Sequence, residues 1–450
     1  MLKEVVIFAT LLAIGCSHDS FRVTFQWKYI NVTWPSVEAK EKALKRFEYI
    51  PANNGITGIK IWKGQMYLAI PRFKTGVPVT LAVTPAVPET IEVYSNSGPI
   101  KFNITEPKLR PFPNWEMQEI GDCGAFQFVQ SMEIDPLGRM WVLDTGRVHT
   151  MTLNPEANCP PRLVILDLEN DGAVLRSIVF PPEVASRETV FLNDIVLDHE
   201  DGGYAYITDT SEQDPGIIVY SLRNNTSWKV RHQSMRAQEE ATHFMVGKIH
   251  VNRPIHVDGI ALSPASVRER IVYYTPLSSF YLYAIPAAVL RNRTIEVNNF
   301  VRELGRKSSQ TDGIAMSSNG ILYYGLLADD AVAYWNTSHR GNSGYQSPSF
   351  ATGQRIFSRD HLLMQWPDTF AFDEEGYLWC VTNKLQNLIA NRYNISDDNF
   401  RVIKSNARAR NYQYYEDGSA PVLPTITAGA DKVGFALGTC LTVLLVLLMK

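Results

Sequence analysis

The chain has 450 residues, of which 45% are hydrophobic and 20% are charged, and its 43 Lys and Arg against 46 Asp and Glu leave a net charge of −3. This balance gives no electrostatic reason to expect nucleic acid as a partner. The 20 Tyr, 20 Phe and 9 Trp residues provide ample apolar material for a large core, and such an aromatic content suits packed sheets.

Residues 1–17 have the composition of a secretory signal. Lys3 supplies a short positive start, residues 5–14 form an apolar run, and Gly15 and Ser17 are small residues of the kind that precede cleavage. The alternative is a buried N-terminal strand. Secretion is supported independently by acceptor triplets for N-glycosylation. These triplets begin at Asn31, Asn103, Asn224, Asn225, Asn292, Asn336 and Asn394. We therefore expect a secreted eukaryotic glycoprotein.

The stretch from Met132 to Asp144 predicts two short strands joined by a tight turn. Met132 and Ile134 alternate with polar neighbours, as residues of a half-buried strand do. Residues 135–138, Asp-Pro-Leu-Gly, supply turn chemistry because proline presets φ and glycine tolerates positive φ. Residues 140–143, Met-Trp-Val-Leu, form an apolar run short enough to be a strand in the core of a sheet.

The chain contains five cysteines, and two of them bracket this hairpin. Cys16 lies at the boundary of the signal segment, and Cys440 lies in the apolar C-terminal tail. A disulfide between Cys123 and Cys159 would clasp the hairpin to its flanking loop, and closing a loop of that size contributes about 4 kcal/mol in the chain-entropy model. We expect Cys380 to be a small buried hydrophobic residue without a disulfide partner.

The same hairpin pattern recurs along the chain, as an apolar strand, a turn and a second apolar strand. The further copies lie at 58–70, 194–209, 258–275, 312–325 and 368–382. Aligned on one another, the copies begin at Gly58, Met132, Ile195, Gly259, Gly313 and Thr369, about sixty residues apart. Six copies at this period predict an all-β fold: a six-bladed β-propeller of four-stranded blades over residues 25–405.

A polar residue opens most of the later copies, and these residues form the candidate ligand-binding set. They are Asn193, Asp194, Asp258, Asp312 and Asp368. If each opens the innermost strand of its blade, their side chains ring one mouth of the central channel. Such a ring could hold a cation such as Ca²⁺, which takes six to eight oxygen ligands, or it could receive the amine of a small molecule. The third alternative is structural: each side chain hydrogen-bonds the backbone of the neighbouring blade and holds the propeller closed.

Sequence motifs of common catalytic sites are absent. The chain has no G-x-S-x-G elbow, H-E-x-x-H, P-loop or dinucleotide-binding glycine pattern, and its cysteine spacings do not resemble a zinc site. His250 and His256 precede Asp258, but we expect solvent-exposed or hydrogen-bonded histidines at strand ends there rather than a metal pair. The sequence identifies no catalytic residue, and we expect no metal and no cofactor.

The C-terminal residues predict attachment to a membrane. Residues 433–449 form a run of 17 uncharged, mostly apolar residues, preceded by a spacer at 421–432 and by small residues around Ser419. Small residues, spacer and hydrophobic tail together describe a glycosylphosphatidylinositol-anchor signal. A single-pass membrane helix and a merely adhesive tail are the alternatives. We accordingly divide the end of the chain into a linker at 406–432 and a tail at 433–450, and expect attachment to the cell surface.

Several segments resemble the yellow and major royal jelly protein family of insects. They are Cys123–Phe126, Met140–Arg147, Cys159–Leu163, Phe191–Ile195, Ala205–Asp209 and Tyr377–Trp379, and the likeness keeps its order from about residue 25 to 405. The resemblance implies a six-bladed propeller and a secreted glycoprotein linked to cuticle pigmentation and melanin formation. Family members often carry a cysteine where this chain has Tyr334, which makes a second disulfide doubtful.

Three functional hypotheses follow. By resemblance, the protein binds or converts catecholamine-derived molecules in melanin formation, with a small aromatic amine or a quinone as the ligand in the channel. The resemblance implies dopachrome conversion by some members, and it assigns no catalytic residue in this sequence. The second hypothesis is a metal-dependent propeller hydrolase similar to lactonases. The third is a non-catalytic surface or matrix glycoprotein. The fold alone does not decide among them.

Overall fold

The computed structural model describes residues 20–95, 98–337 and 349–426. The predicted signal segment, the hydrophobic tail, Cys16 and Cys440 lie outside these residues. Within the described ranges, no helix has both the length and the apolar character needed to span a membrane.

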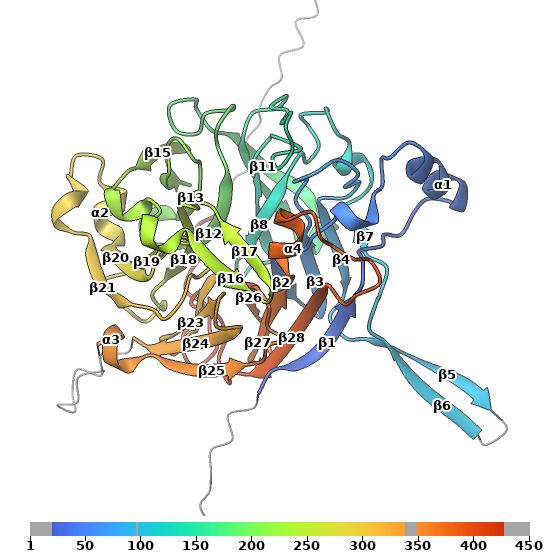
Figure 1. Cartoon of the computed structure of the whole chain (residues 1–450). Coiled ribbons are helices and arrows are strands. Elements are labelled where there is room, and N and C mark those ends of the chain that lie inside the picture. Colours follow the sequence, from blue (N-terminus) through green and yellow to red (C-terminus); the bar gives the residue numbers. More distant parts are fainter. Residues whose placement is uncertain (1–19, 96–97, 338–348, 427–450) are drawn as a thin grey trace, which may run out of the picture.

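Six four-stranded antiparallel sheets surround a central channel, which confirms the predicted six-bladed propeller (Figure 1). The inner strands are β2 (Gly58–Trp62), β8 (Val129–Ile134), β12 (Leu192–Asp198), β18 (Val257–Leu262), β22 (Ile314–Met316) and β26 (Pro367–Phe372). The second strands are β3 (Gln65–Ala69), β9 (Arg139–Asp144), β13 (Tyr204–Asp209), β19 (Ile271–Pro276), β23 (Ile321–Leu326) and β27 (Tyr377–Thr382).

The outer halves of the blades follow the same order. The third strands are β4 (Leu81–Pro85), β10 (Arg162–Asp167), β14 (Gly216–Ser221), β20 (Tyr281–Pro286), β24 (Ala331–Asn336) and β28 (Phe400–Asn406). The outer strands are β7 (Arg110–Pro111), β11 (Ala173–Val179), β15 (Thr226–Val230), β21 (Arg302–Arg306), β25 (Arg355–Arg359) and β1 (Arg22–Trp27). The helices are α1 (Val37–Lys45), α2 (Ala287–Arg291), α3 (Phe350–Gly353) and α4 (Leu385–Ile389).

The ring is closed by pairing between segments from opposite ends of the chain. Strand β1 pairs antiparallel with β28 and so becomes the outer strand of the last blade. Phe25 lies opposite Val402, Trp27 lies opposite Phe400, and all four side chains are buried. The sixth blade is therefore held together by sheet hydrogen bonds and by buried apolar contacts.

Burial explains why the middle strands read as continuous apolar runs. All six residues of β9 are buried, because the neighbouring blades cover both of its faces. The outer strand β11 of the same blade is mostly exposed. The hairpin repeat can be recognised in the sequence because it consists of the buried inner and second strands. The outer strands are more exposed, so their apolar pattern is weaker.

A β-bulge near the start of the inner strands shifts their register. In three blades the inner strand first pairs with the second strand through Val129 and Asp144, Leu192 and Asp209, or Val257 and Pro276. The regular pairing resumes three residues later, at Met132, Ile195 and Ile260. Ser131, Asp194 and Gly259 are thus equivalent positions. The sequence alignment, which began these copies at Met132, Ile195 and Gly259, is one residue late in two blades. Bulges commonly redirect a side chain, and here they precede the functional site.

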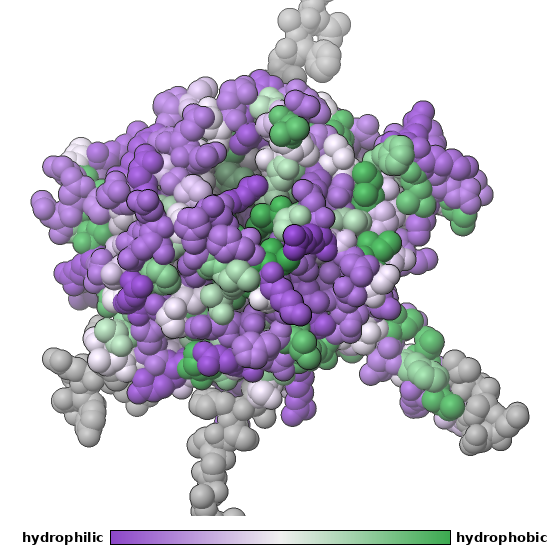
Figure 2. Space-filling model, in the orientation of Figure 1, coloured by the Kyte–Doolittle hydropathy of each residue, from purple (hydrophilic) through white to green (hydrophobic). Residues whose placement is uncertain are grey.

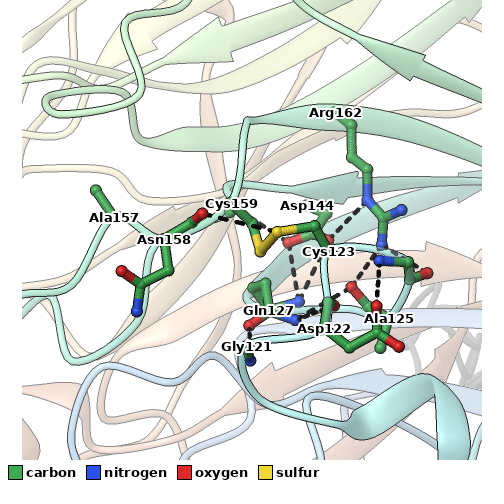
Figure 3. Close-up of a disulfide and its surroundings, with 12 residues drawn as sticks. Gly121, Asp122, Cys123, Ala125, Gln127, Asp144, Ala157, Asn158, Cys159 and Arg162 are labelled. Atoms are coloured by element: carbon green, nitrogen blue, oxygen red, sulfur yellow. Dashed lines mark hydrogen bonds and ion pairs between the residues drawn. A yellow bond between two sulfur atoms is a disulfide. The ribbon is translucent and has the colours of Figure 1, made fainter.

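The predicted disulfide between Cys123 and Cys159 is confirmed (Figure 3). It joins the loop before β8 to the loop before β10. Beside it, Arg162 Nε donates to Asp144 Oδ2 at 3.1 Å and Arg162 Nη2 donates to the carbonyl oxygen of Ala125 at 2.6 Å. Among the described residues Cys380 is buried and has no disulfide partner, as expected.

Two hairpins are added to the blades. Strands β5 (Glu89–Ser95) and β6 (Gly98–Ile104) form a hairpin that projects from the first blade (Figure 1). Strands β16 (His243–Val246) and β17 (Ile249–Asn252) form a second hairpin between the third and fourth blades. The second hairpin lies near α4 on the face turned to the viewer in Figure 1.

Part of the predicted linker packs against the propeller. Tyr412 and Gln413 are buried, and they lie at the ends of the inner strands. The Tyr412 hydroxyl accepts a hydrogen bond from the backbone N–H of Leu197 at 2.7 Å, and Gln413 Nε2 donates to the carbonyl oxygen of Ile134 at 2.8 Å. These contacts cover the end of the channel opposite to the starts of the inner strands.

Candidate functional site

One polar residue per blade lies at or just before the start of the inner strand, and in four blades it falls within a β-bulge. The six residues are Thr57, Gln130, Asn193, Asp258, Asp312 and Asp368, and all are buried. The inner strands approach one another closely at this level, since the backbone N–H of Gly313 donates to the carbonyl oxygen of Asp368 at 2.7 Å. Three predicted carboxylates and Asn193 therefore lie in one layer of the channel.

A cavity of about 540 Å³ opens at this layer. Its floor contains Gln130, Asn193, Thr210, Asp258 and Asp312. Its apolar wall contains Phe73, Met151, Phe191, Ile255, Leu277, Trp366, Leu385 and Ile389. Its other polar residues are Arg147, Thr150, Glu188, Thr189, Glu212, Gln213 and Arg253. Figure 2 shows hydrophobic side chains near the centre of this face, where Figure 1 places α4. The cavity thus combines an apolar wall with an unusually large number of polar and charged side chains, and small-molecule sites use both kinds of contact.

Asp258 and Asp312 form a carboxyl pair on the cavity floor. Their side chains are hydrogen-bonded to each other. Burial and the charge of Asp312 raise the pKa of Asp258 well above its ordinary value. Burial raises the pKa of Asp312 only to about 6, because hydrogen bonds from Asp258 and Trp366 favour its ionised form. Both shifts favour a proton shared by the two carboxyls over two separate negative charges.

Trp366 positions Asp312. Its indole Nε1 donates to Asp312 Oδ2 at 2.6 Å, and its ring lines the cavity wall. The backbone of Trp366 has φ of +57°, which is a strained conformation for a bulky aromatic residue. The surrounding packing, including Phe244 at a ring distance of 5.9 Å, holds it there. Among the described residues Asp258 has no hydrogen-bond partner other than Asp312, so its second oxygen remains available to the cavity.

Three further polar atoms of the cavity lining lack partners. Gln130 Oε1, Arg147 Nε and Thr150 Oγ1 are buried and make no hydrogen bond within the part of the chain described. Gln130 is only 7% exposed, so its unpaired acceptor is costly unless a ligand or water donates to it. By contrast, Asn193 is satisfied, since its Nδ2 donates to Thr210 Oγ1 at 3.0 Å.

Two of the predicted ring residues do not line this cavity. Asp194 occupies the position equivalent to a glycine in other blades, and its Oδ1 accepts from Ser131 Oγ at 3.0 Å. It borders a separate cavity of about 50 Å³ with Lys60 and Glu133, whose side chains are 3.4 Å apart. Its Oδ1 also accepts from the backbone N–H of Ile195 in its own strand, at 2.9 Å. Burial raises the pKa of Asp194, and the nearby Lys60 opposes that shift.

Asp368 lies in the ring but is already bound. Its Oδ2 accepts from Asn383 Nδ2 at 2.5 Å, and the same amide nitrogen donates to the carbonyl oxygen of Ile56 at 2.8 Å. This network ties the last blade to the first. Burial and the charge of Asp312 raise the pKa of Asp368 well above its ordinary value.

The described residues contain no group of three or more His, Cys, Asp and Glu side chains that could hold a metal ion. His256 Nδ1 accepts the backbone N–H of Ala237 at 2.8 Å, and the ring of His250 stacks on His243. His256 is therefore hydrogen-bonded, whereas His250 is exposed and its contact is the ring of His243.

Sequence reasoning missed Gln130, Trp366, Arg147 and Thr150. Gln130 could have been found, because it occupies the place of Asp258 once the copies are aligned without the one-residue offset. The other three lie on loops outside the repeat. Arg147 ends the family-like segment Met140–Arg147, but nothing in that segment indicates a place in a cavity, and no sequence pattern includes Trp366 or Thr150.

Comparisons with known proteins agree with this architecture. The family model described as "Major royal jelly protein" matches residues 127–412. Dopaminechrome tautomerase of Drosophila melanogaster is 24% identical over 404 residues, covering 87% of this chain and 82% of that protein. Protein yellow of Drosophila erecta is 28% identical over 392 residues, covering 84% of this chain and 67% of that protein. Since the family model spans more than half of the chain, this protein belongs to the major royal jelly protein family.

Proposed function

We propose that this protein acts in the melanin pathway by binding a catecholamine-derived small molecule in the channel cavity. Two features of the cavity floor carry the proposal: the unpaired acceptor Gln130 Oε1 and, beside it, the buried carboxyl pair of Asp258 and Asp312. Support also comes from relatives whose names are Dopaminechrome tautomerase and Protein yellow.

The cavity fits both halves of such a ligand. An ammonium or ring N–H group can donate to Gln130 Oε1 and to the single negative charge of the carboxyl pair. In a partly desolvated site these contacts are stronger than in water. The aromatic ring of the ligand can pack on Phe73, Phe191 and Trp366, which lie in the wall. A cation near these rings adds about 0.5–2 kcal/mol.

Calorimetric titration with dopamine tests this proposal. We expect wild-type protein to bind, and the double variant Asp258→Asn with Asp312→Asn to lose affinity by about 10- to 100-fold, since it lacks the negative charge. Gln130→Leu should weaken binding by about 10-fold. Binding by the wild type should also fall below pH 6, because Asp312 has a pKa of about 6 and its protonation neutralises the pair.

The matched control is Asp330→Asn. Asp330 is a buried carboxylate that does not line the cavity, and its φ of +47° is a conformation that asparagine accepts readily. This variant should bind like the wild type. Absence of heat with wild-type protein, or unchanged affinity in the double variant, would refute the proposal.

We also propose an extracellular location with glycans on the propeller surface. Of the acceptor residues, Asn31 is half-buried and its Oδ1 is a buried atom, whereas the other six side chains are exposed. Peptide mapping after glycosidase treatment should find glycans at some of the exposed six and none at Asn31. Attachment to the cell surface is a separate proposal, tested by release with phosphatidylinositol-specific phospholipase; protein that stays bound to the cells would count against a lipid anchor.

A further inference from the structure

We propose that the outer face of the β16–β17 hairpin is a copper-binding site in which His243 and His250 are the nitrogen ligands. Met245 supplies a third donor on the same face, the sulfur of its thioether. The site goes beyond the proposed function, because none of these three residues lines the channel cavity.

The two faces of this hairpin have different roles. Side chains alternate along both strands, so that Phe244, Val246 and Val251 point inward and are buried. They belong to the hydrophobic cluster that also contains Trp366 and Leu385 of the cavity wall. The inward face therefore holds the hairpin on the propeller, and the outward side chains are not needed for that.

The outward face brings together side chains that bind transition metals. The strand register places Met245 directly opposite His250, and Asn252 directly opposite His243. All four side chains are exposed. Within the part of the chain that the structure describes, no hydrogen bond or ion pair engages either imidazole, so the ring nitrogens are available to an ion.

The spacing of the two imidazoles fits a shared ion. The ring centroids of His243 and His250 are 5.6 Å apart, and the ring planes differ by 23°. Metal–nitrogen bonds of about 2.0–2.1 Å place the ring centroids of two histidine ligands about 4.5–6.4 Å apart, depending on the angle at the ion. Nearly parallel rings can each turn one nitrogen toward the same point. Because both side chains are exposed, they can rotate to close the site without disturbing the core.

The donors select the kind of ion. Imidazole nitrogen suits copper and zinc, whereas Ca²⁺ and Mg²⁺ prefer oxygen ligands. Among divalent first-row ions Cu(II) binds such sites most tightly, and a thioether favours Cu(I). Two imidazoles and one thioether therefore indicate copper. A site with only two histidines is compatible with the lack of any larger group of His, Cys, Asp and Glu among the described residues.

Calorimetric titration of the full chain with Cu(II) tests the inference. The protein is prepared without an oligohistidine tag, and glycine is present as a competing chelator. The double variant His243→Gln with His250→Gln isolates this site from any other copper that the chain binds. Each single variant should weaken the site by about 100-fold, because the second imidazole acts on an ion that the first already holds nearby. Without copper, all three variants should melt like the wild type.

His361→Gln is the matched control. The His361 side chain is 78% exposed, and its Nδ1 lies 2.9 Å from the Asp330 carboxylate rather than beside a second imidazole. Its replacement should leave the copper affinity of the hairpin unchanged.

Two further measurements identify the ligands. The electron paramagnetic resonance of Cu(II) at this site should show coupling to two imidazole nitrogens in the wild type and to one in His250→Gln. Met245→Leu keeps the size of the side chain and removes the sulfur. It should weaken Cu(I) binding by about tenfold, measured without oxygen by competition with a chromophoric chelator, and leave Zn(II) binding unchanged.

The outcomes bear on this site alone. Equal Cu(II) binding by the wild type and the double variant overturns the inference, and the two histidines are then ordinary solvated side chains. Equal Cu(I) affinity of the wild type and Met245→Leu overturns the assignment of the thioether. Neither result touches the proposed function, since dopamine binding is measured at a cavity that neither histidine borders.

Discussion

Replacing Arg72 with methionine should lower the free energy of unfolding by at least about 4 kcal/mol. Arg72 is fully buried, and its guanidinium group donates only to backbone carbonyl groups. The five acceptors, at 2.5–3.0 Å, are the oxygens of Val77, Pro78, Gln118, Phe126 and Gln127. Methionine fills similar space but leaves these buried carbonyls without donors.

The effect is large because Arg72 joins segments of different blades. Its acceptors belong to the loop between β3 and β4 and to the loop that leads into β8, next to Gln130. Burial lowers the pKa of Arg72 to about 10, which still leaves it charged at neutral pH. The measurement is the midpoint of urea unfolding followed by tryptophan fluorescence.

Arg46→Met is the matched control. The Arg46 side chain is 59% exposed and pairs with Glu48 at 3.5 Å, also at the surface. Exposed ion pairs contribute about 0–1 kcal/mol, so this midpoint should hardly move. Equal midpoints for the two variants would show that the carbonyl cluster around Arg72 does not stabilise the propeller.

Replacing Gly313 with alanine should also damage the protein severely, by about 3 kcal/mol or more. A Cβ at Gly313 would overlap the carbonyl oxygen of Asp368, which accepts the N–H of Gly313 at 2.7 Å. Because the obstacle is backbone, the last two blades must move apart. This displacement would also shift Asp312, and we expect dopamine binding to be lost.

Gly124→Ala is the control for this prediction. At Gly124 the nearest atom to an added Cβ is a carboxylate oxygen of Asp122 at 3.2 Å, on a flexible surface side chain. The thermal midpoint should change little. A Gly313→Ala protein with the stability and dopamine affinity of the wild type would show that the inner strands tolerate separation at this level.

The sequence predicted the architecture because the most buried strands repeat. Segments such as 312–325 and 368–382 combine an apolar inner strand, a turn and an apolar second strand, and covering by neighbouring blades makes both strands apolar. The disulfide was predictable for a related reason, since Cys123 and Cys159 flank one such hairpin and are separated by 36 positions.

The site was predictable only in part. Asp258 and Asp312 were found because each opens a copy with the same Asp-Gly-Ile-Ala pattern. The predicted set includes Asp194 because the sequence does not reveal the bulge in β12. That bulge makes Asn193, rather than Asp194, the equivalent of Asp258. A bulge adds a residue without changing the hydrophobic pattern, so sequence alignment does not detect it.

The remaining site residues depend on tertiary structure. Trp366, Arg147 and Thr150 reach the cavity from loops, where no periodic pattern constrains the side chain. The polar composition around Tyr412 predicts an exposed linker, whereas in the structure this segment is buried against the end of the channel.

The central claim is that the cavity beside Asp258 and Asp312 receives a catecholamine-derived ligand. A crystal structure of the protein saturated with dopamine tests it most directly. We predict density for the aromatic ring against Phe191 and Trp366, with the ammonium group within hydrogen-bond distance of Gln130 Oε1 and of the carboxyl pair. Density for dopamine elsewhere on the protein, or only water or a metal ion beside the two carboxyls at saturating dopamine, would contradict the account.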